Sequence, residues 1–301
     1  YYASRGLGDV YKRQADMKSY GWEMELSWRD RIEDFNYGVR FTLADGQRKV
    51  LKYPNESGDI YSWYNNKLDG TIWGYTTVGI AQTQEEMNAH LANNKPNWGS
   101  NWGAGDIMYA DLNGDGEVTS GSKTLNDHGD LKVIGNSYAR YNFGFTVDGS
   151  WRGLDFSIFL QGTMKRDYWL DGPYFWGASG DEWQSACFTE HLDYWTPEHT
   201  NAYYPKPYFG NIKKNQEVQS GYLQNAAYLR VKNVQVGYTL PKSWTKKAAM
   251  ESVRFYVSGD NLLTWTGISS IFDPETLGGD WGPGKLYPLQ RTLSVGVNVN
   301  F

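Results

Sequence analysis

Seven segments of the chain alternate apolar and polar residues, and the spacing between them constrains the fold more than any other feature. The segments cover about residues 20–29, 35–43, 141–147, 154–161, 233–240, 253–258 and 293–301. Strict alternation is typical of a β-strand with one apolar and one polar face. The connections between the segments are in turn short, long, short, long, moderate and long. Loops longer than about 15 residues are uncommon in compact domains, so this pattern favours an outer-membrane barrel with short periplasmic turns and long external loops.

The predicted fold is therefore all-β, an antiparallel transmembrane β-barrel. Its long extracellular loops are expected at about residues 46–138, 164–225 and 263–288. A soluble β-sandwich is the alternative, because alternation alone does not distinguish a face that packs inward from a face that meets lipid. Charged residues on the polar parity, among them Glu25 and Arg254, favour the barrel, since a hydrated lumen accommodates them.

The last residue, Phe301, fixes the sidedness of the predicted barrel. If Phe301 is periplasmic, every long connection falls outside and every short one inside. Trp28, Phe35 and Trp151 then join Phe301 at the periplasmic rim, where an aromatic girdle is expected.

Composition excludes several classes of protein. The chain of 301 residues has a net charge of -5 and a mean hydropathy of -0.64, and it lacks the run of about 18 apolar residues that a membrane helix needs. The mild acidity argues against nucleic-acid binding. The single cysteine, Cys187, cannot form an internal disulfide and is expected to be a free thiol.

The first 14 residues show no alternation and are expected to be non-native, derived from an adapter. The chain begins with Tyr rather than Met, so it is expected to be a fragment. The absence of a signal peptide then says nothing about location.

Two further segments depart from the alternating pattern. The alternation slips at Arg230 and Lys232. A β-bulge with two solvated bases explains the slip, and so does a segment that rises to the outer interface beside anionic lipid phosphates. Residues 83–94 are the best candidate for a helix, with Thr83 as the N-cap and Glu86 three residues later.

Several motifs resemble those of the SusC/RagA-type TonB-linked outer-membrane receptors. They include GWEMELSWRDRIEDFNYGVRFTLADG at 21–46, GDIMYADLNGDGEVT at 105–119, AAYLRVKNVQVGYTLPKSW at 226–244 and YPLQRTLSVGVNVNF at 287–301. The resemblance covers about residues 15–301. It implies the C-terminal seven strands of a barrel of about 22 strands, whose N-terminal plug and TonB-engaging segment lie outside this chain.

The resemblance also implies a function. Receptors of this family are nutrient importers in the outer membrane of Gram-negative, Bacteroidetes-type bacteria, driven through the TonB complex. They take up oligosaccharides, and sometimes peptides, together with a SusD-like surface lipoprotein. A terminal Phe such as Phe301 resembles the signal used in barrel assembly. A soluble or surface-anchored glycan-binding β protein is the alternative function.

A stretch of alternating oxygen-bearing residues suggests a calcium loop at 111–119. Asp111, Asn113, Asp115 and the carbonyl of Glu117 match the start of an EF-hand-type loop. The bidentate acid is missing at the twelfth position, where Ser122 stands, and Asp127 or Asp130 is a candidate substitute. The alternative is a metal-free turn rich in Asp, Asn and Gly. No other cofactor is expected.

The long connections are rich in tryptophan, and aromatic faces stack on sugar rings. The candidate substrate-binding residues are Trp98, Trp102, Trp169, Trp176 and Trp195. The alternative is that these rings pack the loops onto one another or onto a protein partner. No catalytic motif, P-loop or dinucleotide fingerprint is found, so the chain is not expected to be an enzyme.

Overall fold

The computed structural model describes residues 15–177, 187–208, 213–278 and 282–301. The chain divides into two compact units. The loop unit comprises residues up to 20, 47–138 and 188–223, and the sheet unit comprises residues 21–46, 139–187 and 224–301. Residues 1–14, expected to be non-native, lie outside the described part of the chain.

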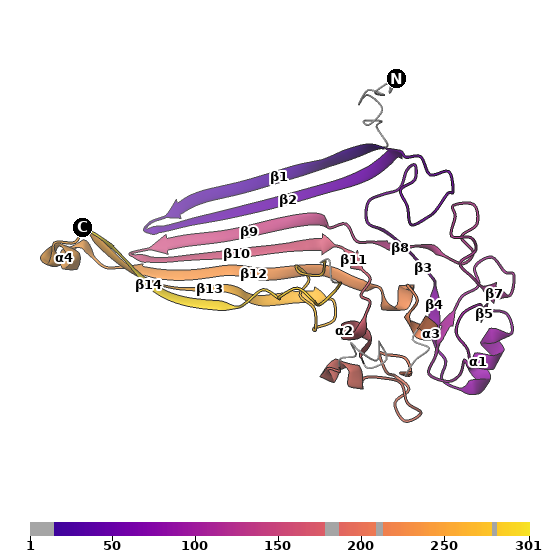
Figure 1. Cartoon of the computed structure of the whole chain (residues 1–301). Coiled ribbons are helices and arrows are strands. Elements are labelled where there is room, and N and C mark those ends of the chain that lie inside the picture. Colours follow the sequence, from indigo (N-terminus) through magenta and orange to yellow (C-terminus); the bar gives the residue numbers. More distant parts are fainter. Residues whose placement is uncertain (1–14, 178–186, 209–212, 279–281) are drawn as a thin grey trace, which may run out of the picture. The chain divides into compact units, whose positions relative to one another are not determined.

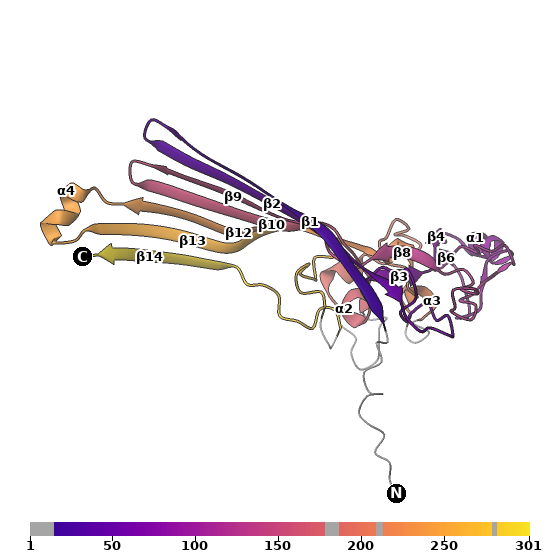
Figure 2. The same ribbon diagram turned by 90° about the horizontal axis from the view of Figure 1, so that it is seen from above.

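Seven long strands form one sheet in which each strand pairs with the next long strand along the chain, in the order β1-β2-β9-β10-β12-β13-β14 (Figures 1 and 2). The pairings from β2 to β14 are all antiparallel. All seven predicted strands are confirmed. Their bounds are β1 Asp16–Ile32, β2 Phe35–Lys52, β9 Arg140–Trp151, β10 Leu154–Lys165, β12 Gln224–Thr239, β13 Ser252–Gly267 and β14 Thr292–Asn300.

The connections keep the predicted order of lengths. Residues 33–34 join β1 to β2, and residues 152–153 join β9 to β10. Arg152 and Gly153 have φ angles of 47° and 92°, as the central residues of a tight hairpin turn require. The long connections are 53–139, 166–223 and 268–291. The sheet unit also holds β11 (Asp167–Tyr168), α2 (Pro173–Trp176), α4 (Lys242–Thr245) and η5 (Lys246–Ala248).

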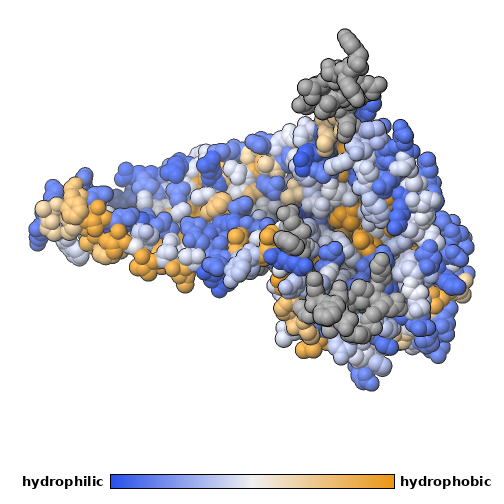
Figure 3. Space-filling model, in the orientation of Figure 1, coloured by the Kyte–Doolittle hydropathy of each residue, from blue (hydrophilic) through white to orange (hydrophobic). Residues whose placement is uncertain are grey.

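One face of the sheet is apolar and largely exposed. The strand register sets apolar residues opposite one another in rows that cross the sheet. The row nearest the short turns is Phe35, Trp151, Leu154, Tyr238, Phe255 and Val297. Val236, Val257 and Val295 of the next row are 47%, 54% and 82% exposed, and apolar residues gather along β13 and β14 in Figure 3.

The exposure of this face decides against the sandwich. A sandwich would bury the face against a second large sheet, whereas every other sheet among the described residues has two strands. The edges are β1, in which every residue is exposed, and β14, in which only Gly296 is partly covered. Among the described residues, no helix has the length and apolar character to cross a membrane.

A β-bulge in β12 explains the slip of alternation at Arg230 and Lys232. In the pairing with β10, Asn233 lies opposite Phe159 and Val231 lies opposite Leu160, so Lys232 is the extra residue. The extra residue reverses the parity of the preceding segment. Leu229 and Val231 therefore remain on the apolar face, and Arg230 turns to the polar face.

The two bases pair with carboxylates of the connection between β13 and β14. Arg230 Nη2 lies 2.8 Å from Asp273 Oδ1, and Arg230 Nη1 lies 3.0 Å from Glu275 Oε1. Lys232 Nζ lies 2.8 Å from Glu275 Oε2. The side chain of Arg230 is only 4% exposed. The bulge is thus confirmed, but the expected partners, water or lipid phosphates, are wrong.

On the polar face, two ion pairs reach across an intervening strand. Arg254 of β13 binds Asp155 of β10 through Nε, at 2.9 Å, and Nη2, at 2.5 Å. Gly237 of β12 lies between them, and a Cβ there would stand 2.4 Å from Arg254 Nη2. Arg29 of β1 reaches Asp148 of β9 at 3.2 Å, across Gly38 of β2, where a Cβ would stand 2.9 Å from Asp148 Oδ1. Glycine suits both crossings, because a larger residue would displace the charged ends of Arg254 and Asp148 from their present positions.

The loop unit is built from short elements. The helices are α1 (Gln84–Leu91), η3 (Thr189–Leu192), α3 (Lys213–Gln216) and η4 (Ser220–Tyr222). The paired strands are β3 (Thr71–Gly74) with β8 (Lys132–Asn136), β4 (Thr77–Ile80) with β6 (Ile107–Tyr109), and β5 (Lys95–Pro96) with β7 (Glu117–Val118). Helix α1 begins as predicted, since Thr83 Oγ1 accepts the backbone N–H of Glu86. Glu86 in turn accepts the N–H of Gln82.

A buried ion pair joins distant segments of the loop unit. Lys214 Nζ lies 2.6 Å from Asp106 Oδ2, and the two side chains are 1% and 0% exposed. Asp106 also accepts the backbone N–H of Gly103 and the side-chain amide of Asn215. Lys214 also donates to the carbonyl of Asn101. A buried charge is tolerated only with such partners, so this cluster holds segment 101–107 against segment 214–215.

Replacing Arg230 with Met should release the connection between β13 and β14. The change removes the described cation of Asp273 and leaves Glu275 with Lys232 alone. Breaking a buried ion pair costs about 3–5 kcal/mol. Hydrogen exchange of the amides at 268–278 in the full-length protein should become faster by about 10²–10⁴-fold. Lys232→Met is the matched control and should have a much smaller effect, because Arg230 then still binds both carboxylates. Equal exchange in the two variants would show that Arg230 does not hold the connection.

The same cluster predicts a pH dependence. Burial tends to raise the pKa of Asp273, but the hydrogen bond from Arg230 and the backbone N–H groups of Glu275 and Leu289 hold it below the ordinary value of 3.8. A lowered carboxyl pKa stabilises the fold above the ordinary pKa, and the stabilisation is lost as the pH falls through the folded-state pKa. At pH values below about 4, the protection of amides 268–278 against hydrogen exchange should therefore decrease. Arg230→Met should remove most of this pH-dependent decrease.

Candidate functional site

The loop unit contains a small pocket with aromatic and polar walls. Its volume is about 150 Å³. Its lining includes Tyr61, Tyr75, Asn97, Trp98, Lys123 and Glu217. Sites for small polar ligands combine apolar or aromatic surface with a few hydrogen-bonding groups. The volume and the lining suit one ring-sized polar group.

Trp98 is the predicted substrate-binding residue that lines this pocket. Its ring stacks on Tyr75 with centroids 4.6 Å apart, and it meets Tyr109 edge-on at 5.2 Å. Its indole Nε1 is buried and has no hydrogen-bond partner among the described residues. A buried indole N–H usually finds an acceptor, so a ligand or water hydroxyl is a suitable partner.

The phenols of the pocket remain protonated at physiological pH. Burial and the charge of Glu217 raise the pKa of Tyr75 well above its ordinary value, against a hydrogen bond from Ser120 that lowers it. Burial and Glu217 also raise the pKa of Tyr61. Both hydroxyls can therefore donate hydrogen bonds. The pocket joins segments 61–75, 97–98, 123 and 217, which are so distant in sequence that no local motif could have revealed it.

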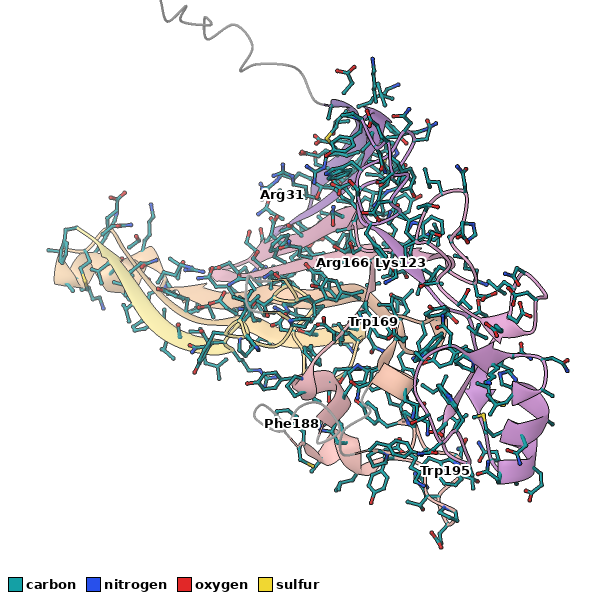
Figure 4. All side chains as sticks on the ribbon, turned by 45° about the vertical axis from the view of Figure 1, so that its right-hand side comes forward. Arg31, Lys123, Arg166, Trp169, Phe188 and Trp195 are labelled. Carbon is teal, nitrogen blue, oxygen red and sulfur yellow. The ribbon has the colours of Figure 1, made fainter. Side chains whose placement is uncertain are left out.

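Trp102 and Trp195 pack the loop unit. Trp102 lies against the cluster of Ala81, Met87 and Met108, and Lys214 Nζ stands 5.3 Å from its ring. Trp195, which is labelled in Figure 4, comes from the loop unit. It is 4% exposed, and its Nε1 donates to Gln82 Oε1 at 3.1 Å. A Cβ on Gly105 would stand 2.4 Å from this ring. These contacts agree with the packing alternative for both residues.

Trp169 and Trp176 lie in the sheet unit. Their ring centroids are 6.1 Å apart, and Trp176 packs edge-on against Phe175 at 5.1 Å. Trp176 is only 6% exposed. Trp183 and Trp281, which also belong to the long connections, lie outside the described residues. The five predicted tryptophans are thus divided between two units, and Trp98 is the member with a described pocket beside it.

The predicted calcium loop closes on itself through hydrogen bonds. Asp111 accepts the backbone N–H groups of Asn113, Gly114 and Gly116 at 3.0, 2.6 and 2.8 Å. Asp115 accepts the N–H of Glu117 and the side-chain amide of Asn113, each at 2.9 Å. The bonds from Asn113 N–H to Asp111 and from Glu117 N–H to Asp115 are Asx-turn bonds. Among the described residues, no group of three or more His, Cys, Asp or Glu side chains is placed to hold a metal ion.

The two candidate substitutes for the missing acid differ. Asp130 is fully buried and accepts the N–H groups of Leu112 and Thr119 at 2.6 and 2.7 Å, so it lies against the loop. Asp127 instead accepts the backbone N–H and hydroxyl of Ser122. The calcium site stays a prediction.

A second, larger hollow lies on the polar face of the sheet near the short turns. Its volume is about 640 Å³. Arg29, Arg31, Asp148, Asp155 and Ser157 are among its lining residues. It therefore lies beside the ion pairs that cross β2 and β12. Most of the lining residues are charged or polar, and the lining also includes Tyr37 and Phe156.

Comparison with known proteins identifies relatives along nearly the whole chain. No family model matches. TonB-dependent receptor P3 of Formosa agariphila is 25% identical and covers 98% of this chain. TonB-dependent receptor SusC of Bacteroides thetaiotaomicron is 22% identical and covers 95% of this chain. The chain spans 30% of the length of receptor P3 and 26% of that of SusC.

Solved structures agree in fold. The structure of the RagAB peptide transporter matches 95% of this chain with a TM-score of 0.68 and 20% sequence identity, over 30% of the matched chain. The RagAB peptide importer in the open-open state matches with a TM-score of 0.66. These relatives are receptors and transporters rather than enzymes. The chain is therefore similar, along almost its entire length, to part of TonB-dependent receptors that include SusC, and it has the fold of the matching part of the RagAB transporter.

Proposed function

We propose that this chain is part of an active importer in the outer membrane of a Gram-negative, Bacteroidetes-type bacterium. The importer takes up oligosaccharides or similarly large nutrients, driven through the TonB complex. The observation that carries the proposal is the open antiparallel sheet with an exposed apolar face, in a chain whose relatives are TonB-dependent receptors.

The two faces of the sheet fit the two environments of a membrane barrel. The exposed apolar rows suit contact with lipid, and the charged hollow around Arg29 and Asp155 suits a hydrated lumen. The unpaired edges β1 and β14 suit a sheet that continues into further strands, because closure of a barrel removes exposed edges. In this arrangement the long connections 53–139, 166–223 and 268–291 are extracellular.

The extracellular connections are proposed to contact both the substrate and a SusD-like lipoprotein. The pocket at Trp98 is the proposed contact for one ring of the substrate, because it offers aromatic surface, phenol donors and the charges of Lys123 and Glu217. Phe301, which is 89% exposed after β14, is proposed to serve the assembly machinery of the outer membrane.

The proposal predicts energy-dependent uptake. In cells that produce the full-length protein, uptake of labelled oligosaccharides or peptides should require the protein and should stop when a protonophore collapses the proton gradient. Trp98→Ala should reduce binding of the active substrate about two- to tenfold, as expected for one aromatic contact. Trp63→Ala is the control, because Trp63 is exposed and does not line the pocket. Surface binding without any protonophore-sensitive uptake would instead support a glycan-binding protein and overturn the importer.

We also propose that the loop at 111–119 binds Ca²⁺. Calorimetric titration of the full-length protein should give a heat of binding in the millimolar-to-micromolar range, and Asp115→Ala should abolish it. Glu56→Ala, a change at an exposed acid outside the loop, should leave the heat unchanged. Absence of any heat in the unmodified protein would show that the turn is metal-free.

A further inference from the structure

The connection between β12 and β13 is an ordered, basic and aromatic turn. It contains α4 and η5, and its sequence at 241–250 is PKSWTKKAAM. Thr245 is buried at its centre, where its hydroxyl lies 3.4 Å from the carbonyls of Lys242 and Glu251. The backbone N–H of Glu251 donates to the carbonyl of Asn300, so the turn is fixed against the end of β14.

The side chains around Thr245 point away from the protein. Trp244 is 63% exposed, and the side chains of Lys242, Lys246 and Lys247 are exposed as well. Within the described residues, none of these three lysines forms an ion pair or a side-chain hydrogen bond. Glu251, also exposed, is the single acidic residue of the connection. The turn therefore presents unneutralised positive charge beside an unpacked indole.

The turn follows directly on the most aromatic row of the apolar face. That row includes Trp151, Tyr238 and Phe255, which are 50%, 42% and 48% exposed. Phe301 is 89% exposed and follows the residue whose carbonyl holds the turn. In Figure 3 the apolar surface along β13 and β14 continues to the turn. Along the apolar face toward the turn, the exposed side chains are thus first aliphatic, then aromatic and finally basic.

This order matches the layers of a bilayer surface. Aliphatic side chains suit the hydrocarbon region, aromatic side chains concentrate at its boundary, and Lys side chains bind the phosphates of anionic lipids. A contiguous exposed apolar surface with a basic rim is typical of a site that binds a membrane or another molecule.

We propose that the α4–η5 turn is a lipid anchor. Trp244 enters the boundary of the bilayer level with the aromatic row, and Lys242, Lys246 and Lys247 bind the headgroups of anionic phospholipids in the periplasmic leaflet. The inference rests on the proposed outer-membrane location, and it adds a lipid-binding site at the short-turn end of the sheet.

Lipid retention tests the anchor. Native mass spectrometry of the detergent-solubilised full-length protein would compare phosphatidylglycerol with phosphatidylethanolamine. The triple change K242Q/K246Q/K247Q should weaken phosphatidylglycerol binding by up to about 100-fold, since each lysine contributes about fivefold near an anionic surface. The control K95Q/K132Q/K206Q removes three exposed charges of the loop unit that do not line the pocket at Trp98, and it should not change phosphatidylglycerol binding. Equal loss in both triple variants, or no loss in either, would overturn the proposal.

A second measurement does not depend on the lysine variants. A cysteine at position 244, in protein lacking other cysteines, would carry a bimane label, and lipids brominated at different depths would serve as quenchers. We expect quenching by lipids brominated near the headgroup. A label at Asn298, on the polar face of β14, should not be quenched. Absence of quenching at position 244 would mean that the turn faces water or a protein, and displacement of phosphatidylglycerol by millimolar inorganic phosphate would mean a free-phosphate site; either overturns the anchor.

Failure of the anchor can be distinguished from failure of the importer. Heat-dependent migration on a gel reports whether the full-length protein forms a barrel. If the barrel forms and uptake is energy-dependent while the turn shows no lipid contact, only the anchor is wrong. If no barrel forms, both proposals are wrong.

Discussion

The constant parity of side chains across the main sheet is the constraint on which the rest of the structure depends. In an antiparallel sheet, a slip of one residue transfers every apolar side chain to the opposite face. The bulge at Lys232 prevents this outcome in β12, because it restores Leu229 and Val231 to the apolar face. The same bulge places Arg230 on the polar face, where it pairs with Asp273 and Glu275. One extra residue therefore keeps the apolar face continuous and also fixes the connection between β13 and β14.

Glycine positions divide between the two faces for different reasons. On the polar face, Gly38 and Gly237 leave space for ion pairs that cross a strand. On the apolar face, a Cβ at Gly149 would stand 2.5 Å from the ring of Phe156, so this glycine gives an aromatic neighbour its place in the sheet. Ion pairs on the polar face and aromatic contacts on the apolar face therefore join strands of the sheet, in addition to the backbone hydrogen bonds. Among the described residues, the exposed apolar face has no packed core to stabilise it.

The loop unit obtains its order from aromatic packing and buried polar pairs. Trp102, Trp195 and the pair of Asp106 with Lys214 join segments that are about 100 residues apart in sequence. Much of the high aromatic content that suggested sugar binding is therefore used to hold long connections together. The pocket at Trp98 and Tyr75 lies within this packing and is the contact proposed for one ring of the substrate.

The sequence by itself determined the seven strands, their order of connection and the start of helix α1, because alternation and capping are local and repeat along the chain. It also carried the motifs of the receptor family. Only the tertiary structure decided the partners of Arg230 and Lys232, the packed state of Trp102 and Trp195, and the pocket beside Trp98. Each of these depends on contacts between residues from distant segments, and neither residue type nor spacing records which segments meet.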